Sequence, residues 1–203
     1  LFEGLPNAIV NTVSLIVFKN MGMPNDKLTF YTSMLSFPWL LKIVLSPMVD
    51  TVSKKRIWTI AMQFLMVVCT LSLGIILPKS TLSPILVLFL ATAFASSIHD
   101  IAADGFYMLA LNQKNQSAFV GIRSTFYRLA NVFGNGVIVA VAGLLENSTG
   151  NIPLAWQLTL GGSSVLLAGL TVFHAFAVPK AQGDVSHLKE DSSDKVKAIF
   201  KEF

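Results

Sequence analysis

Long apolar stretches separated by short polar turns dominate the chain, and six of them are long enough to be candidate membrane spans. They cover residues 2–18, 28–49, 57–77, 82–109, 116–145 and 154–178. A helix needs about 20 apolar residues to cross the hydrocarbon core of a bilayer. Only helices and closed barrels satisfy their backbone hydrogen bonds in lipid, and these runs are too long and too continuous for barrel strands. The pattern therefore predicts an all-α integral membrane protein with six transmembrane helices.

The composition agrees with a membrane protein and restricts the chemistry. Hydrophobic residues make up 53% of the 203 positions. Charged residues make up 13%, against about 25% in soluble domains. The net charge of +4 gives no sign of a nucleic-acid partner. The single cysteine, Cys69, lies inside an apolar run, so neither a disulfide framework nor a cysteine metal cluster is available. We expect a lipid bilayer around the chain, and neither a cofactor nor a metal.

The basic residues near the ends of the predicted spans are divided unequally between the two sides of the membrane. One side receives six: Lys54, Lys55, Arg56, Lys114, Arg123 and Lys180. The other side receives three: Lys19, Lys27 and Lys79. Because the side richer in Lys and Arg faces the cytoplasm, both ends of the chain are predicted to be cytoplasmic, in a plasma (inner) membrane.

The chain changes character after the sixth apolar segment. Residues 1–178 are predicted to form the six-span bundle, and residues 179–203 a cytoplasmic linker in which acidic and basic residues balance. An amphipathic helix is predicted in this linker, with four apolar residues on one face: Val196, Ile199, Phe200 and Phe203. We interpret the chain as part of a longer protein, with the linker leading to a missing second half.

Charged residues interrupt four of the apolar segments at a similar depth. With a helical rise of about 1.5 Å per residue, Glu3, Lys42, Asp100 and Arg128 lie about 22–25 Å from the outer ends of their helices. Asp104 lies about 6 Å beyond Asp100. A charge at the membrane centre costs about 2.5–3.5 kcal/mol, so these groups are expected to pair across a shared aqueous cleft. Two cations for three carboxylates leave one carboxylate over, which is a candidate proton carrier.

Snorkelling of side chains to the lipid headgroups is the alternative explanation, above all for Asp104 and Arg123. The third and sixth segments contribute no charge to the layer, and His99 is expected at the interface rather than in a proton relay. Pairing segment one with four, two with five and three with six puts charge in the first two pairs only, which indicates an inverted three-plus-three repeat. Small residues in the fifth segment favour close helix packing: Gly134, Gly136, Ala140 and Gly143.

The stretch from Ser46 to Ile57 resembles the signature between spans two and three of the major facilitator superfamily. The acid Asp50 and the basic pair at 54–55 match that signature, whereas Ser46 and Ser53 stand at its glycine positions and Thr51 at its first basic position. An acid and a basic cluster that flank a tight turn can form an ion-pair latch. The latch, or cytoplasmic gate, is predicted from four residues: Asp50, Lys54, Lys55 and Arg56.

Four further stretches resemble the muropeptide permease (AmpG-type) branch of this superfamily, whose neighbours include acetyl-coenzyme A transporters. They are Glu3-Gly4-Leu5-Pro6, residues 39–50, residues 100–105 (Asp-Ile-Ala-Ala-Asp-Gly) and residues 127–131 (Tyr-Arg-Leu-Ala-Asn). The resemblance implies a twelve-span transporter of which this chain is the N-terminal six-helix half. It also implies that spans one and four line the cavity, that two and five flank the interface of the halves, and that three and six pack outside.

The same resemblance implies proton-coupled solute symport by alternating access, with a muropeptide or related amino-sugar solute as cargo. Glu3, Asp100 and Asp104 would carry or sense the proton. Six residues are candidates for binding the substrate: Lys42, Arg128, Tyr127, Asn131, Asn11 and Tyr107. The implied partners are the solute, protons, the bilayer and a C-terminal six-helix half.

Two alternatives stay open. One is transport of another solute by the same fold, such as a sugar or an acetyl-coenzyme A-like molecule. The other is a non-transporting six-span protein, for example an assembly factor or an intramembrane enzyme. The three histidines are scattered along the chain, and no nucleophile–base motif accompanies them: His99, His174 and His187. We therefore expect no enzyme.

Overall fold

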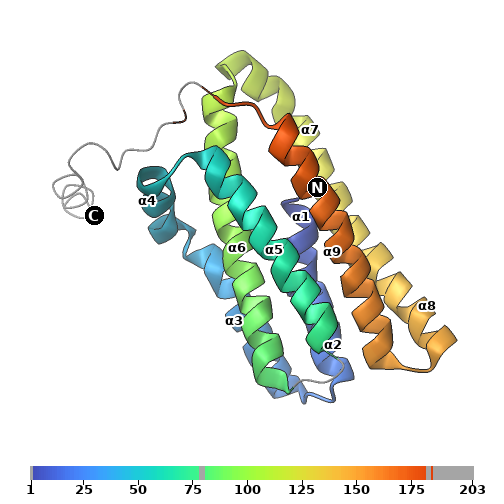
Figure 1. The fold of residues 1–203 in the computed structure, drawn as a ribbon. Helices are drawn as coiled ribbons and strands as arrows, with labels where there is room; N and C mark the ends of the chain where they lie inside the picture. The colour runs from blue at the N-terminus through green and yellow to red at the C-terminus, as the bar shows by residue number, and fades with distance from the viewer. Residues whose placement is uncertain (1, 78–80, 182–183, 185–203) are drawn as a thin grey trace.

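The computed structural model describes residues 2–77, 81–181 and 184, so the predicted linker helix lies outside the described residues. The described residues form helices and no strand (Figure 1). In chain order these are α1 (Gly4–Ala8), η1 (Ile9–Val13), α2 (Ser14–Asn20), α3 (Asn25–Leu40), α4 (Lys42–Val52), α5 (Lys55–Ile76), α6 (Leu82–Ala110), α7 (Gln113–Val132), η2 (Phe133–Ile138), α8 (Val139–Thr149) and α9 (Ile152–Ala177), where η marks a π-helical segment. The predicted all-α class is confirmed for this part of the chain.

Four helical stretches are long and apolar enough to cross a membrane. They are α5, α6, α9 and the stretch Gln113–Thr149, which joins α7, η2 and α8. Helices α3 and α4 bend by 45° at a short break and make a fifth candidate if they count as one span. The first stretch, from Gly4 to Asn20, is shorter. A helical membrane architecture therefore stands, while the count of six spans and the inverted repeat remain predictions.

The bend between α3 and α4 falls at Leu41 and has a cause in the sequence. Pro38 lies inside α3, three residues before the break. Proline has no N–H to donate and its ring crowds the preceding turn, so helices kink beside it. Helix α4 then begins at Lys42, directly after the bend.

Small residues let the first stretch pack closely against α7 and η2. A Cβ on Gly4 would lie 2.7 Å from the Cβ of Ala130, and a Cβ on Gly134 would collide with the Cβ of Ala8. The predicted close packing is therefore confirmed at Gly134. An added Cβ would meet nothing among the described residues at two other glycines of the predicted set: Gly136 and Gly143.

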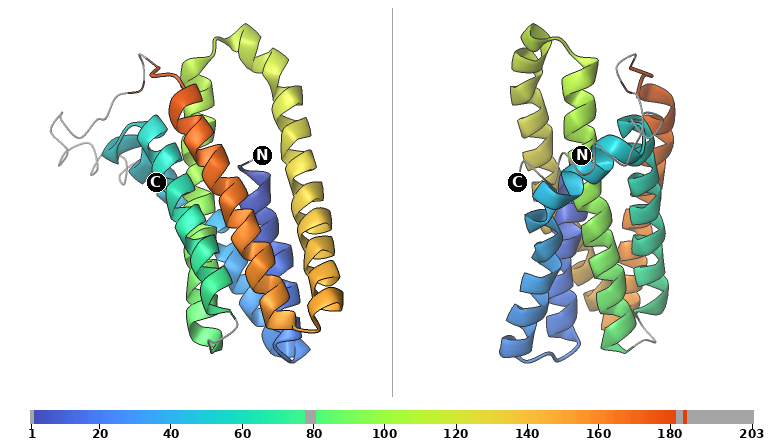
Figure 2. Two further views of the ribbon diagram at one scale, coloured as in Figure 1. Left: turned by 45° about the vertical axis from the view of Figure 1, so that its right-hand side comes forward. Right: turned by 90° about the vertical axis from the view of Figure 1, so that its left-hand side faces the viewer.

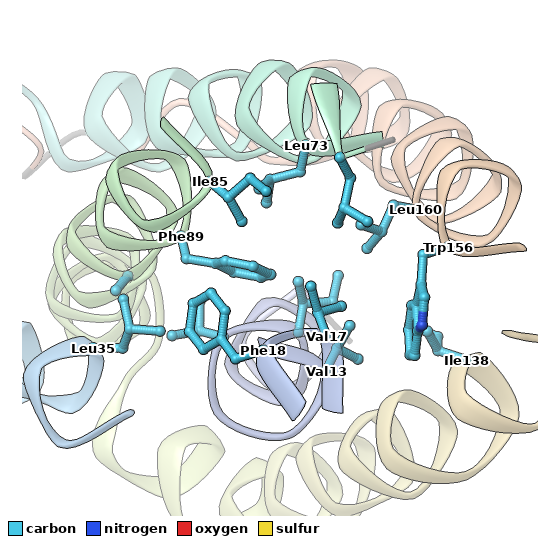
Figure 3. Close-up of a cluster of buried hydrophobic side chains, with 14 of the residues drawn as sticks. Val13, Val17, Phe18, Leu35, Leu73, Ile85, Phe89, Ile138, Trp156 and Leu160 are labelled. Atoms are coloured by element: carbon cyan, nitrogen blue, oxygen red, sulfur yellow. The ribbon is translucent and has the colours of Figure 1, made fainter. Parts of the chain in front are cut away.

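An apolar core fills the half of the bundle towards the α2–α3 turn. Val13 and Val17 of the first stretch lie at the centre of this cluster, surrounded by side chains of α3, α5, α6, η2 and α9 (Figure 3). The rings of Phe18 and Phe89 meet edge to face, with centroids 5.6 Å apart. Figure 2 shows the elongated bundle with this turn at one end and the α6–α7 turn at the other. We call the second end, which also holds the α4–α5 turn, the charged end.

Candidate functional site

A single guanidinium joins two carboxylates from different helices near the charged end. Arg123 of α7 donates a hydrogen bond of 2.6 Å from Nη2 to Oε1 of Glu3, the residue before α1. The same nitrogen donates to Oδ1 of Asp104 on α6. The guanidinium carbon also lies 5.3 Å from the centre of the Tyr107 ring, within the range of a cation–π contact. With all three ionised, the Glu3–Arg123–Asp104 cluster has a formal charge of −1.

A second ion pair joins the bend after α3 to α6. Lys42 Nζ lies 2.9 Å from Oδ2 of Asp100, and Trp39 Nε1 donates to the same oxygen at 3.2 Å. The Asp100 side chain is only 15% exposed. Its other oxygen, Oδ1, is buried and has no hydrogen-bond partner among the described residues. The bend after Leu40 therefore places a cation against a carboxylate whose second oxygen stays unpaired.

The predicted layer of charges is only partly reproduced. Lys42 pairs with Asp100, one of the three acids expected to take a cation of the layer, but the cation between Glu3 and Asp104 is Arg123. Arg128 is exposed on α7 and makes no ion pair with the described residues, so the prediction that it neutralises a buried acid was wrong. Positions 123 and 128 are five residues apart, which turns their side chains about 140° away from each other on a helix. The depth of a residue in the membrane does not show on which face of its helix the side chain lies.

The predicted latch forms between one acid and one base. Lys55 Nζ lies 2.7 Å from Oδ1 of Asp50 across the α4–α5 turn. The side chain of Lys55 crosses α6 at Gly105, where a Cβ would collide with its Cδ and Cε atoms. Lys54 is exposed and has no ion pair within the described residues. Whether this contact acts as a gate stays a prediction.

Arg56 has no ion pair with an acid side chain of the described residues and instead connects α5 to the end of α9. Its guanidinium donates to the carbonyl oxygens of Ala175 at 2.7 Å and Val178 at 3.0 Å. Asp184, which the sequence did not single out, accepts from the backbone N–H groups of Lys55 at 2.7 Å and Arg56 at 3.0 Å. These contacts satisfy backbone groups at a helix start and at a helix end.

The third and sixth segments contribute a buried polar cluster that the sequence analysis missed. The Gln63 amide nitrogen on α5 lies 3.0 Å from Nε2 of His99 on α6 and 2.9 Å from Nδ1 of His174 on α9. His99 is 2% exposed, so the expectation of an interface position was wrong. Gln63 and His174 each lie in an apolar run that carries no formal charge. A neutral polar group buried in such a run needs a hydrogen-bond partner, and this need is the signal in the sequence that points to the cluster.

One pocket of about 430 Å³ is lined by all three residues of the Gln63 cluster and by Glu3 and Arg123 of the other cluster. Its walls come from the N-terminal residues and from α5, α6, α7 and α9. It is lined by polar groups of both clusters and by aromatic rings: Glu3, Gln63, His99, Arg123, His174, Phe2, Phe106, Tyr107, Phe126 and Tyr127. Of the six predicted substrate-binding residues, only Tyr107 and Tyr127 are in this lining.

The remaining predicted residues lie elsewhere. Asn11 donates to the carbonyl oxygen of Asn7 and accepts from the Ser36 hydroxyl, while Asn131 donates to the carbonyl oxygen of Tyr127. A second pocket, of about 670 Å³, is lined by residues of α4, α5 and α6. Its lining includes four charged residues and one glycine: Lys42, Asp50, Lys55, Asp104 and Gly105. Glu3 and Arg123 line the first pocket, whereas Asp100 and Arg128 are in neither lining.

A helical bundle with apolar spans and internal ion pairs beside a pocket defines a polytopic membrane protein, and the comparisons agree. The chain belongs to the BT1 family, whose model matches residues 4–151. This family is related to the major facilitator superfamily and includes AmpG-type proteins. The chain is also 27% identical over 182 residues to a Rickettsia felis protein named "Putative transporter AmpG 4". The match covers 84% of this chain and 41% of that curated relative, so the chain spans less than half of its length.

These comparisons confirm the predicted resemblance and support a membrane transporter in general. They point away from an enzyme, since both the family and the relative are transporters.

Proposed function

We propose that this chain is the N-terminal six-span half of a proton-coupled solute symporter in which the Glu3–Arg123–Asp104 cluster binds the transported proton. The observation that carries the proposal is the sharing of one guanidinium by carboxylates from two other helices beside a pocket. One proton brings the formal charge of this cluster to zero. A neutral cluster costs less to enclose when the pocket closes and loses water. Asp100, which forms an ion pair with Lys42, is the second candidate for the carboxylate that binds the proton.

An anionic solute would compete with the carboxylates for Arg123. Guanidinium binds carboxylate and phosphate groups through paired, charge-assisted hydrogen bonds. The aromatic rings of the pocket would pack against the apolar faces of the same solute. Following the resemblance to the muropeptide permease branch, the cargo is a muropeptide or another amino-sugar solute, and Lys42 and Arg128 offer two further cations for its anionic groups.

The two halves of the transporter would rock around this site, with the N- and C-terminal ends of this chain in the cytoplasm and the protein in the plasma membrane. The Asp50–Lys55 ion pair would form in one state and break in the other, which makes it a gate at the charged end. Breaking a solvated ion pair costs about 1 kcal/mol or less, which suits a contact that must open and close.

Uptake into proteoliposomes tests the proposal. The whole protein is reconstituted, and accumulation of labelled muropeptide, amino sugar or acetyl-coenzyme A is measured with and without an inward proton gradient. We expect gradient-driven uptake of the muropeptide, and loss of the gradient effect in Glu3→Gln and Asp104→Asn. Glu146→Gln, a change of a half-buried acid near the end of α8, is the matched control and should leave uptake intact. Unchanged coupling in both Glu3→Gln and Asp104→Asn would contradict the assignment.

A further inference from the structure

The buried cluster of Gln63, His99 and His174 has a hydrogen-bond pattern that follows from its chemistry. Gln63 is 1% exposed, and its amide nitrogen lies between His99 Nε2 and His174 Nδ1. The Phe2 ring covers both imidazoles, with centroids at 5.5 Å from His99 and 5.9 Å from His174. An amide nitrogen has two hydrogens to donate and accepts none. His99 Nε2 faces only this nitrogen and must therefore be an unprotonated acceptor. His174 Nδ1 also lies 3.2 Å from the Gln63 carbonyl oxygen, so it can either accept from the nitrogen or donate to the oxygen.

This pattern determines where the proton of His99 lies. A neutral imidazole carries one N–H, so an accepting Nε2 leaves the proton on Nδ1. The Nδ1 atom is buried without a hydrogen-bond partner among the described residues, and it lies 3.9 Å from Oδ1 of Asp100. That oxygen is also buried and unpaired in the described part of the chain. A donor and an acceptor therefore face each other, slightly too far apart for a direct hydrogen bond.

The opposite orientation of the Gln63 amide is less favourable. If the carbonyl oxygen stood in place of the nitrogen, His99 would have to donate from Nε2 and its Nδ1 would become an acceptor. Two acceptors, Nδ1 and the Asp100 carboxylate, would then face each other in a buried place. Buried polar atoms that cannot pair cost free energy, so the neighbouring carboxylate favours the orientation seen here.

We propose that Gln63 is a positioning residue, which fixes the tautomer of His99 so that this histidine presents an Nδ1 proton to the unpaired oxygen of Asp100. A movement of less than 1 Å, or one bridging water, completes this contact. Asp100 then has donors on both oxygens, Lys42 and Trp39 on Oδ2 and His99 on Oδ1. Each oxygen of the carboxylate keeps a hydrogen bond when Lys42 leaves, a consequence that rests on the proposed transport cycle.

Nitrogen-15 NMR of histidine-labelled whole protein in lipid nanodiscs tests the tautomer without any transport. We expect an unprotonated Nε2 and a protonated Nδ1 on His99. A His99 with its proton on Nε2 would overturn the inference, whatever the uptake assays give. The expected tautomer together with an absent proton gradient effect on uptake would leave the positioning role standing and remove only the proposed coupling.

The variant Gln63→Glu has almost the same shape but an ionised carboxylate accepts only. It should move the His99 proton to Nε2 and lower gradient-driven uptake about tenfold, equivalent to about 1.4 kcal/mol. The same change on α9, Gln157→Glu, is the control and should alter neither the spectrum nor the uptake. A His99 spectrum that does not respond to Gln63→Glu, or that responds equally to Gln157→Glu, would show that Gln63 has no specific role.

Discussion

Lys55 reaches Asp50 by crossing helix α6 directly over Gly105. The absence of a side chain at that position leaves the space that the Cδ and Cε atoms of Lys55 occupy. The 2.7 Å ion pair at the charged end therefore depends on a glycine that lies 55 residues further along the chain than the acid. The contact that resembles a latch in the sequence is completed by a third helix.

Gly105→Ala is expected to break this ion pair and to leave the fold nearly unchanged. The new Cβ displaces the far end of a flexible side chain, and a pair of this exposure contributes about 0–1 kcal/mol. A double-mutant cycle with Asp50→Asn measures the effect through thermal unfolding. In the Gly105→Ala background, Asp50→Asn should cause no further change. An equal effect of Asp50→Asn in both backgrounds would mean that the pair survives.

The two arginines of α7 should respond differently to substitution. Arg123→Ala leaves two carboxylates without their cation and is expected to destabilise the protein by about 1–3 kcal/mol, which is below the usual cost of a fully buried pair because the side chain is 33% exposed. Arg128→Ala removes no ion pair seen in the described residues and should change stability by about 0.5 kcal/mol or less. Thermal unfolding in one detergent compares them. Equal losses would contradict the pairing described here.

Asp184 should act as the N-terminal cap of α5 although it lies more than 120 residues away in sequence. Asp184→Ala removes the acceptor of two backbone N–H groups and is expected to cost about 0.5–2 kcal/mol. Asp184→Asn keeps an accepting oxygen and should lose less. Hydrogen exchange of the first turn of α5 reports the change directly. Faster exchange there in Asp184→Ala, with none in Asp26→Ala at the start of α3, is the expected result.

Two glycines should differ sharply when alanine replaces them. At Gly4 the new methyl group meets Ala130 and the backbone of α7 at 2.7 Å, so the helices must separate, at a cost of about 1–3 kcal/mol. At Gly136 it meets open space, and alanine favours a helix by up to about 1 kcal/mol. The melting temperature should therefore fall for Gly4→Ala and stay level or rise for Gly136→Ala. A fall of the same size in both would contradict the close approach.

Much of the fold and part of the site followed from the sequence. The apolar runs located α5, α6, α7–α8 and α9, because lipid-length helices need uninterrupted apolar residues. An ion pair of Lys42 with an acid of the same layer followed from depth, but the identity of that acid, Asp100, did not. Arg123 was counted with the charges at the cytoplasmic ends of the helices, and Asp184 and the Gln63 cluster were missed. The charge and depth of a residue in its own segment do not show which groups another helix brings close to it. The family resemblance was confirmed, while proton coupling, cargo and gate remain proposals.

The sequence by itself determined where helices run and how deep each charged group lies, since the rise of a helix per residue is constant. Only the tertiary structure decided which groups face each other. That depends on the rotation of each helix about its axis, on the bend at Leu41 and on the π-helical turns, and none of these follows from spacing along the chain. The amide of Gln63 reaches two imidazoles only because three helices pack together, since a hydrogen bond forms only between groups in direct contact.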